Sequence, residues 1–212
     1  MGINSFKFCS FNNSFTCLGR FNMIIAIVGM PGAGRTEVSK LFEKKGFTRI
    51  RFGDVTDKEL EKRSMDLTEE NERYIRESLR AQYGMDAYAK LNLPRIEDAL
   101  KKNDKIVIDG MYSLEEFLFL RRKFPDLTML AVIASPETRH QRLMKDNTRP
   151  LTLEECVFRD ISMLENLRLG GPIALADFTI INEGGKKELE KKVDVVSYTH
   201  LRAHESSLHI VC

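Results

Sequence analysis

The feature that most constrains this chain is a glycine-rich turn that directly follows a short apolar segment. Residues 24–28 are continuously apolar, as expected for a strand that is covered on both faces of a sheet. The next eight residues, G-M-P-G-A-G-R-T at 29–36, match the phosphate-binding pattern G-x-x-x-x-G-K-[ST] except at Arg35. A helical pattern then runs from about Gly34 to Lys45. This order of strand, loop and helix is the context that the motif requires, so the sequence predicts a nucleotide phosphate site.

Each residue type in this loop has a physical role in phosphate binding. Glycines let the backbone curl so that its N–H groups point at phosphate oxygens, and the following helix adds its positive N-terminal end. Thr36 is expected to supply a hydroxyl to Mg²⁺, and Arg35 to reach the β- and γ-phosphates of ATP. Arginine keeps the charge of the usual lysine but carries a larger, planar fork, so binding should survive the change better than catalysis. The predicted cofactor-binding residues of this segment are Gly29, Met30, Pro31, Gly32, Ala33, Gly34, Arg35, Thr36 and Glu37.

Two acidic residues lie at the ends of further predicted strands. Asp109 closes the apolar run 105–109, where a carboxylate in proteins with this loop holds Mg²⁺; the alternative is an aspartate that only caps a turn. Asp54 follows the weaker strand 49–53. Because ligands gather at the carboxyl ends of parallel strands, Asp54 is predicted to orient an acceptor hydroxyl or to act as a base. An N-cap of the next helix is the open alternative for Asp54.

Strands and helices are predicted to alternate along the rest of the chain. Capping signals open helices at 113–116, 135–136 and 152–155, the last helix ending at Gly170-Gly171. Residues 57–102 are predicted to form several helices, punctuated by Gly84 and Pro94, that cover a substrate site. Alternation predicts an α/β fold with three layers, a central parallel sheet between helices. Further strands are expected at 128–134 and 178–181, and a last helix at 186–193.

Composition narrows the expected partners and compartment. Lys plus Arg number 33 and Asp plus Glu 31, so the net charge of +2 gives no reason to expect nucleic acid or an anionic membrane. The four cysteines show no C-x-x-C spacing, and no apolar run approaches the roughly 20 residues of a membrane helix. We therefore expect a cytoplasmic protein with a small-molecule partner, present as a monomer or small homo-oligomer.

Both ends of the chain differ from its centre. Residues 1–22 are Phe-rich without a clear period. A true extension is one interpretation, and sequence translated from upstream of the true start is the favoured one, so the domain is predicted to span 23–196. The tail 197–212 holds His200, His204, His209 and Cys212. A metal site is one interpretation, since His at i and i+4 share a helix face. A non-native appendix is the favoured one, because no carboxylate pattern accompanies the histidines.

These segments together resemble P-loop kinases of the dephospho-CoA kinase and nucleoside-monophosphate kinase group. The resemblance covers about 23–193 and is strongest to the uncharacterised, mainly archaeal branch of dephospho-CoA-kinase-like proteins. Besides the loop, it is carried by F-G-D-V at 52–55, S-L-R-A-Q-Y-G-M-D-A at 78–87, I-V-I-D-G at 106–110, R-H-Q-R-L at 139–143 and A-L-A-D-F-T-I-I-N-E-G at 174–184.

The resemblance implies a kinase with a core, an acceptor-binding helical region and a lid. It places Arg80 in the acceptor region as an anion-binding residue, Arg142 and Arg149 in the lid as groups that close on ATP phosphates, and Asn182 near the adenine base. Exposed charge with no such role is the alternative for the three arginines. The sequence departs from the group at Arg35 and at residues 55–57, where many monophosphate kinases have an arginine. The second departure argues against a standard nucleoside-monophosphate acceptor.

The sequence thus predicts an ATP- and Mg²⁺-dependent transfer of a phosphoryl group to a small acceptor, dephospho-CoA-like or nucleotide-like. Asp54, Asp109 and the cations Arg35, Arg142 and Arg149 would carry the reaction. The alternative, which Arg35 motivates, is a nucleotide-sensing module that binds ATP with little or no turnover. A third and weaker alternative, an NTPase that acts on nucleic acid, is disfavoured by the near-neutral charge.

Overall fold

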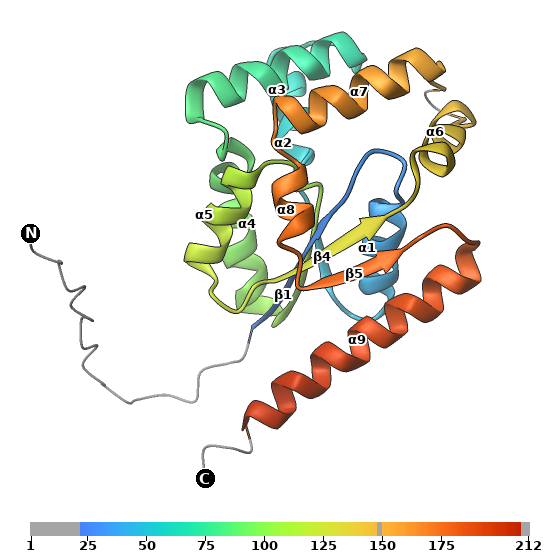
Figure 1. Cartoon of the computed structure of the whole chain (residues 1–212). Coiled ribbons are helices and arrows are strands. Elements are labelled where there is room, and N and C mark those ends of the chain that lie inside the picture. The colour runs from blue at the N-terminus through green and yellow to red at the C-terminus, as the bar shows by residue number, and fades with distance from the viewer. Residues whose placement is uncertain (1–21, 148–149, 209–212) are drawn as a thin grey trace, which may run out of the picture.

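The computed structural model describes residues 22–147 and 150–208 of the chain (Figure 1). The predictions for the N-terminal segment 1–21, for Arg149 and for residues 209–212 lie outside the described residues. Five strands form one parallel sheet in the order β2-β3-β1-β4-β5. They are β1 (Met23–Val28), β2 (Thr48–Arg51), β3 (Lys105–Asp109), β4 (Thr128–Ile133) and β5 (Phe178–Ile181).

Helices cover both faces of the sheet, which confirms the predicted three-layer α/β architecture. Helices α1 and α9 pack on one face, and α4, α5 and α8 on the other (Figure 1). In the described residues the helices are α1 (Arg35–Lys44), α2 (Asp54–Lys62), α3 (Glu69–Tyr83), α4 (Ala87–Lys102), α5 (Leu114–Lys123), α6 (Pro136–Met144), α7 (Leu153–Glu165), α8 (Gly170–Ala174) and α9 (Lys186–Leu208). Helices α2, α3 and α4 form the predicted helical insertion between β2 and β3.

The central strand β1 explains where the functional edge of the molecule lies. All six of its residues are buried, as the apolar run predicts for a strand with neighbours on both sides. Its register pairs Ile27 with Asp109 on β3 and Val28 with Ala131 on β4. The strands therefore end at the same edge, and the loops that follow them meet there.

At the starts of three helices, the capping residues in the sequence were sufficient to predict where the helix begins. Both capping boxes form, with Ser113 and Thr152 accepting hydrogen bonds from the N3 backbone of their helices. Ser135 likewise caps α6, with Pro136 in its first turn. The helix starts at 113–116, 135–136 and 152–155 are thus confirmed.

Four boundary predictions were wrong. Pro94 lies inside α4 rather than at a break, since burial of Asn92 and Ile96 holds this stretch on the core. Helix α7 ends at Glu165, before a reversal at Arg168 with a φ of 51°. The glycines at 170–171 instead begin α8, where a side chain at Gly171 would meet Leu114 of α5 at 3.2 Å. Helix α9 continues to Leu208, beyond the expected end at 193, and β2 ends at Arg51 instead of residue 53.

Among the helices of the described residues, none has the combination of length and apolar character needed to cross a membrane.

Candidate functional site

The phosphate-binding loop has a backbone that only glycine can adopt at its centre. Gly32 and Gly34 have φ angles of 78° and 98°, in the left-handed region. A Cβ at Gly32 would lie 2.6 Å from the carbonyl oxygen of Arg139, and one at Gly29 would lie 2.3 Å from that of Val132. The loop is thus pressed against the backbone of β4 and α6, and its curl follows from the absence of side chains.

A buried ion pair that the sequence analysis did not predict holds this loop from behind. The Arg139 guanidinium donates to the Pro31 carbonyl oxygen at 3.1 Å and to both carboxylate oxygens of Asp160 on α7 at 2.7 Å. His140 also contacts Asp160, at 2.9 Å. Burial raises the pKa of Asp160, but the hydrogen bonds from Arg139 and His140 outweigh this and hold that pKa below its ordinary value. Helix α7 is therefore tied to the loop.

Asn182 supports the same loop from the end of β5. Its side chain is buried and donates from Nδ2 to the carbonyl oxygen of Ala33 at 2.8 Å. A Cβ at Gly34 would meet that nitrogen at 2.4 Å. The structure thus gives Asn182 a role in positioning the loop, and its expected contact with adenine stays a prediction.

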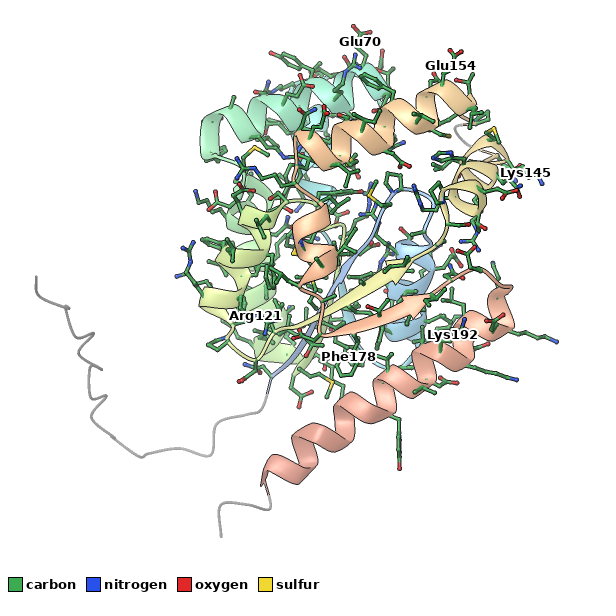
Figure 2. The ribbon with its side chains drawn as sticks, viewed as in Figure 1. Glu70, Arg121, Lys145, Glu154, Phe178 and Lys192 are labelled. Atoms are coloured by element: carbon green, nitrogen blue, oxygen red, sulfur yellow. The ribbon has the colours of Figure 1, made fainter. Side chains whose placement is uncertain are left out.

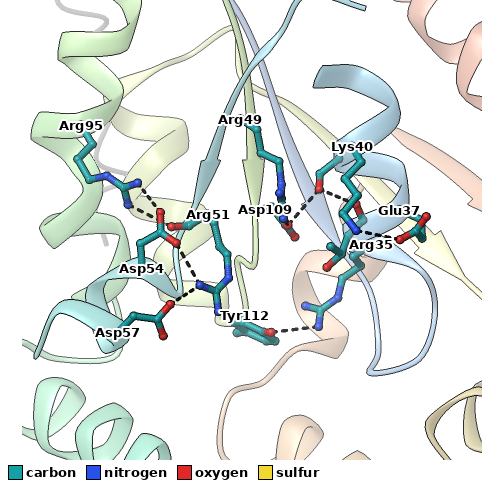
Figure 3. Close-up of polar contacts among 12 residues, drawn as sticks. Arg35, Glu37, Lys40, Arg49, Arg51, Asp54, Asp57, Arg95, Asp109 and Tyr112 are labelled. Carbon is teal, nitrogen blue, oxygen red and sulfur yellow. Dashed lines mark hydrogen bonds and ion pairs between the residues drawn. The ribbon is translucent and has the colours of Figure 1, made fainter. Parts of the chain in front are cut away.

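The side chain of Arg35 is directed toward Tyr112, in the loop that follows β3 (Figure 3). The guanidinium carbon lies 4.4 Å from the centre of the Tyr112 ring, and Nη2 donates to the phenol oxygen at 3.1 Å. Nη1 is buried and has no hydrogen-bond partner among the described residues. The positive charge of Arg35 lowers the pKa of the half-buried Tyr112 phenol. Tyr112 escaped the sequence analysis, because nothing local signals its contact with a residue 77 positions away.

Asp109 lies at the carboxyl end of β3, as predicted, and is nearly fully buried. Its Oδ2 accepts a hydrogen bond from Arg49 Nη2 at 2.5 Å (Figure 3) and lies 3.0 Å from the donor Ser39 Oγ. Ser39 Oγ also lies 2.9 Å from the Thr36 carbonyl oxygen, so its single proton is shared between the two acceptors and links Asp109 to the first turn of α1. Asp109, the carboxylate predicted to hold Mg²⁺, is therefore already paired with the cation of Arg49.

The donor set at this edge suits a metal ion held largely by a nucleotide. No group of three or more His, Cys, Asp or Glu side chains that could hold a metal occurs among the described residues. Mg²⁺ needs no such group, because it typically keeps several waters and is bound by one or two carboxylates with substrate phosphates. Thr36 is exposed at the start of α1, and Oδ1 of Asp109 is the oxygen that could face a metal. Glu37 instead pairs with Lys40 and Lys186.

Asp54 lies just beyond the carboxyl end of β2, in a network of arginines. It is the first residue of α2, and Gly53 is the N-cap, so the alternative role of Asp54 as N-cap was wrong. One carboxylate oxygen accepts from Arg51 at 3.1 Å and the other from Arg95 at 2.6 Å (Figure 3). Arg51 also pairs with Asp57. The role of Asp54 as a base or orienting group remains a prediction. The structure adds that Arg51 and Arg95 hold its carboxylate in place.

Arg80 lies on α3 beside a second buried polar cluster. Its guanidinium lies over the ring of Tyr88, 5.0 Å from the ring centre, and Tyr88 shares a 2.6 Å hydrogen bond with Thr56. Arg80 Nε is buried and has no hydrogen-bond partner among the described residues. The predicted anion-binding role of Arg80 stays a prediction that this geometry can accommodate.

Glu116 on α5 belongs to the same cluster and is predicted to make stability depend on pH. Burial raises its pKa to about 7, although the charge of Arg80 opposes this. The folded state then holds a proton that the unfolded chain releases above 4.5, so stability falls as pH rises from about 4.5 to 7. We expect a loss on the order of 3 kcal/mol. Urea unfolding at pH 5 and pH 8 measures it, and Glu116→Gln should remove most of the difference; an equal difference in the variant would contradict the assignment.

Arg142 lies between the phosphate loop and the loop before α9. Its guanidinium approaches the carbonyl oxygens of Gly32 and Gly184 at 3.4 and 3.5 Å. It lines an open hollow of about 470 Å³ together with Lys145, the residue that follows α6 and is labelled in Figure 2. The other lining residues are Thr138, Gln141 and Glu183. Arg142 is thus next to the loop, as the lid prediction requires.

Arg159 on α7 is a further cation of the site that the sequence analysis missed. Its positive charge adds to the larger effect of Arg35, which lowers the pKa of the Tyr112 phenol. It precedes Asp160, which anchors α7 to Arg139. Its sequence context is an ordinary charged helix, so only the tertiary structure shows that its charge acts on Tyr112.

Comparison with known proteins decides the family. A family model described as an AAA domain matches residues 25–156. A UPF0200 protein of Thermococcus gammatolerans is 38% identical over 175 residues, which cover 81% of this chain and 92% of the relative. Another, from Thermococcus onnurineus, is 36% identical over 186 residues, covering 86% of this chain and all of the relative. The chain belongs to the UPF0200 family.

Solved structures add the fold of this UPF0200 chain. Shikimate kinase from Bacteroides thetaiotaomicron is similar with a TM-score of 0.57 and 13% identity, over 84% of this chain and 97% of that one. A gluconokinase from Sinorhizobium meliloti is similar with a TM-score of 0.54 and 15% identity, over 91% and 98%. At such identities the likeness shows the P-loop kinase fold alone.

Proposed function

We propose that this UPF0200 chain transfers the γ-phosphoryl group of ATP to a small acceptor. The observation that carries the proposal is the convergence of three features at one edge of the sheet. The curled glycine loop leads into α1. Arg35 offers a buried Nη1 that has no hydrogen-bond partner in the described part of the chain, and the carboxylate of Asp109 ends the neighbouring strand β3. Phosphoryl transfer depends mainly on positioning and on charge stabilisation, which this set of groups can supply.

The donor half of the site follows from the loop. Its backbone N–H groups and the N-terminus of α1 would bind the ATP phosphates, and Arg35 would offer Nη1 to the β- and γ-phosphates. Arg142 would close on them, and the hollow beside it would take the adenosine. Thr36 and Asp109 would hold Mg²⁺, which would neutralise phosphate charge when bound.

The acceptor half would lie under the insertion formed by α2, α3 and α4. Asp54, positioned by Arg51 and Arg95, would orient the acceptor hydroxyl, and Arg80 would bind an anionic group of the acceptor. A phosphate-bearing alcohol such as dephospho-CoA, or a nucleotide, has both groups. The protein would act as a monomer or small homo-oligomer, without nucleic acid.

ADP release by the full chain with Mg-ATP tests the proposal, against dephospho-CoA and a panel of nucleoside monophosphates. We expect one acceptor to raise ADP release well above the acceptor-free rate, and Asp54→Asn to lower that acceptor-dependent rate by roughly 10²-fold. Asp98→Asn, on the exposed side of α4, is the control that should leave it unchanged. No acceptor dependence in a protein that binds ATP would contradict the transfer.

A nucleotide-binding regulatory module is the second candidate, because two charges of the site are already engaged. Arg35 is bonded to Tyr112, and Asp109 is bonded to Arg49. If Arg35→Lys turns over with an acceptor while the unmodified chain binds ATP without turnover, the module is favoured. Acceptor-dependent turnover in the unmodified chain would rule it out.

A further inference from the structure

Arg35 differs from a lysine in the directions in which it can donate hydrogen bonds, and the residues around it fit this difference. An ammonium is a point charge that attracts phosphate from many directions, whereas a guanidinium offers its N–H groups only in a plane. An arginine at this place of the loop therefore needs to be held in one orientation. Such an orientation requires a partner that occupies one edge and one face of the fork and leaves another edge available.

Tyr112 is placed to be that partner. Its ring covers the face of the guanidinium, and its hydroxyl oxygen accepts a hydrogen bond from Nη2. Nη1 is left as a buried donor without a partner among the described residues. A buried donor of this kind favours an incoming oxygen acceptor, because leaving it unpaired is costly. The stem of Arg35 also runs past Gly29, where its Cγ would lie 3.4 Å from an added Cβ, so the fork stays beside the loop.

We propose that Tyr112 is a positioning residue that orients Arg35, so that the pair performs the task of a single P-loop lysine toward the terminal phosphates of ATP. The inference rests on the proposed nucleotide site but not on any acceptor. It gives Tyr112 a role through Arg35 and not through direct contact with substrate. The same aromatic face would be unnecessary for a lysine, which supplies the discriminating experiment.

Affinities for ATP and AMP, measured by calorimetry on the full chain without Mg²⁺, test the inference. AMP lacks the β- and γ-phosphates, so the ratio of the two affinities reports on the groups that bind these phosphates, and a change of that ratio in a Tyr112 variant reports on Arg35. We expect Tyr112→Leu to weaken ATP binding roughly tenfold while AMP binding is nearly unchanged, and Tyr112→Phe, which keeps the ring, to have a smaller effect. In an Arg35→Lys background Tyr112→Leu should change the ratio little. Tyr74→Phe, on an exposed tyrosine, is the matched control.

Two outcomes of the binding experiment would overturn the proposal on Tyr112. If Tyr112→Leu binds ATP as tightly as the unmodified chain, or more tightly, then Tyr112 does not orient Arg35 and the proposal is overturned. An unmodified chain that prefers ATP no more than AMP overturns it as well. If the ATP-to-AMP ratio changes as expected while no acceptor yields ADP, the proposed transfer fails and the inference on Tyr112 stands.

Ultraviolet titration of the Tyr112 phenol is a second readout. A Tyr112 that only filled space in the fold would show no dependence of its ionisation on Arg35. The difference between the unmodified chain and Tyr112→Phe isolates Tyr112, whose ionisation should occur below the ordinary phenol value. Arg35→Gln should move that ionisation upward, because it removes the adjacent charge. An unchanged titration in Arg35→Gln would show that the two side chains are not in contact in solution.

Discussion

Gly32→Ala is expected to abolish measurable ATP binding. The new methyl group would lie 2.6 Å from the Arg139 carbonyl oxygen and 3.0 Å from its Cα, and these are backbone atoms that cannot move aside alone. Arg139 is fixed in turn by Pro31 and Asp160, so the loop would have to change shape. Because a loop of this type binds phosphate through the directions of its N–H groups, such a change would remove the proposed site. Calorimetry with ATP measures the result.

The variant Gly46→Ala separates the cost of the left-handed backbone conformation from the cost of a steric clash, which Gly32→Ala combines. Gly46 has a similar φ of 87°, but an added Cβ would meet nothing within 4 Å. We expect this variant to lose about 1–2 kcal/mol of stability from the left-handed conformation alone and to bind ATP normally. Chemical denaturation and calorimetry on both variants make the comparison. Normal ATP binding by Gly32→Ala would show that the loop does not lie against α6 as described.

Asp160→Asn is expected to have the second largest effect, on stability and on the loop together. The Arg139 side chain is only 5% exposed, and the substitution would leave its charge buried with a neutral partner. Removing one member of a buried pair is strongly destabilising, and we expect a loss of roughly 3 kcal/mol in the free energy of unfolding. ATP affinity should fall as well, since Arg139 also fixes the Pro31 carbonyl.

The pH dependence of this difference gives an internal check. The pKa of Asp160 is lowered in the folded state, so its contribution is present above the ordinary carboxyl value of 3.8 and is lost as pH falls through the lower folded value. The stability gap between the unmodified chain and Asp160→Asn should therefore narrow only in strong acid. Asp98→Asn, which breaks an exposed pair with Lys101, should leave stability unchanged. A gap of similar size for both variants would contradict the buried pair.

Some of the fold was readable because its signals are local. The apolar runs that became β1 and β3, the capping residues Ser113 and Thr152, and the glycine loop are each encoded within about ten neighbouring residues. Where a local signal competed with packing, the sequence analysis failed. Pro94 predicts a break, yet the buried side chains around it keep α4 continuous.

The candidate site likewise has one part that local sequence signals determine and another part that tertiary packing determines. The sequence by itself determined the phosphate loop, the position of Asp109 at a strand end and the parallel sheet that brings them to one edge, since these depend on residue type and order along the chain. Only the tertiary structure decided that Tyr112 faces Arg35, that Asp160 fixes Arg139 and that Asn182 holds the loop. Those contacts join residues 21 to 149 positions apart, and their energies depend on burial and direction, which no local pattern carries.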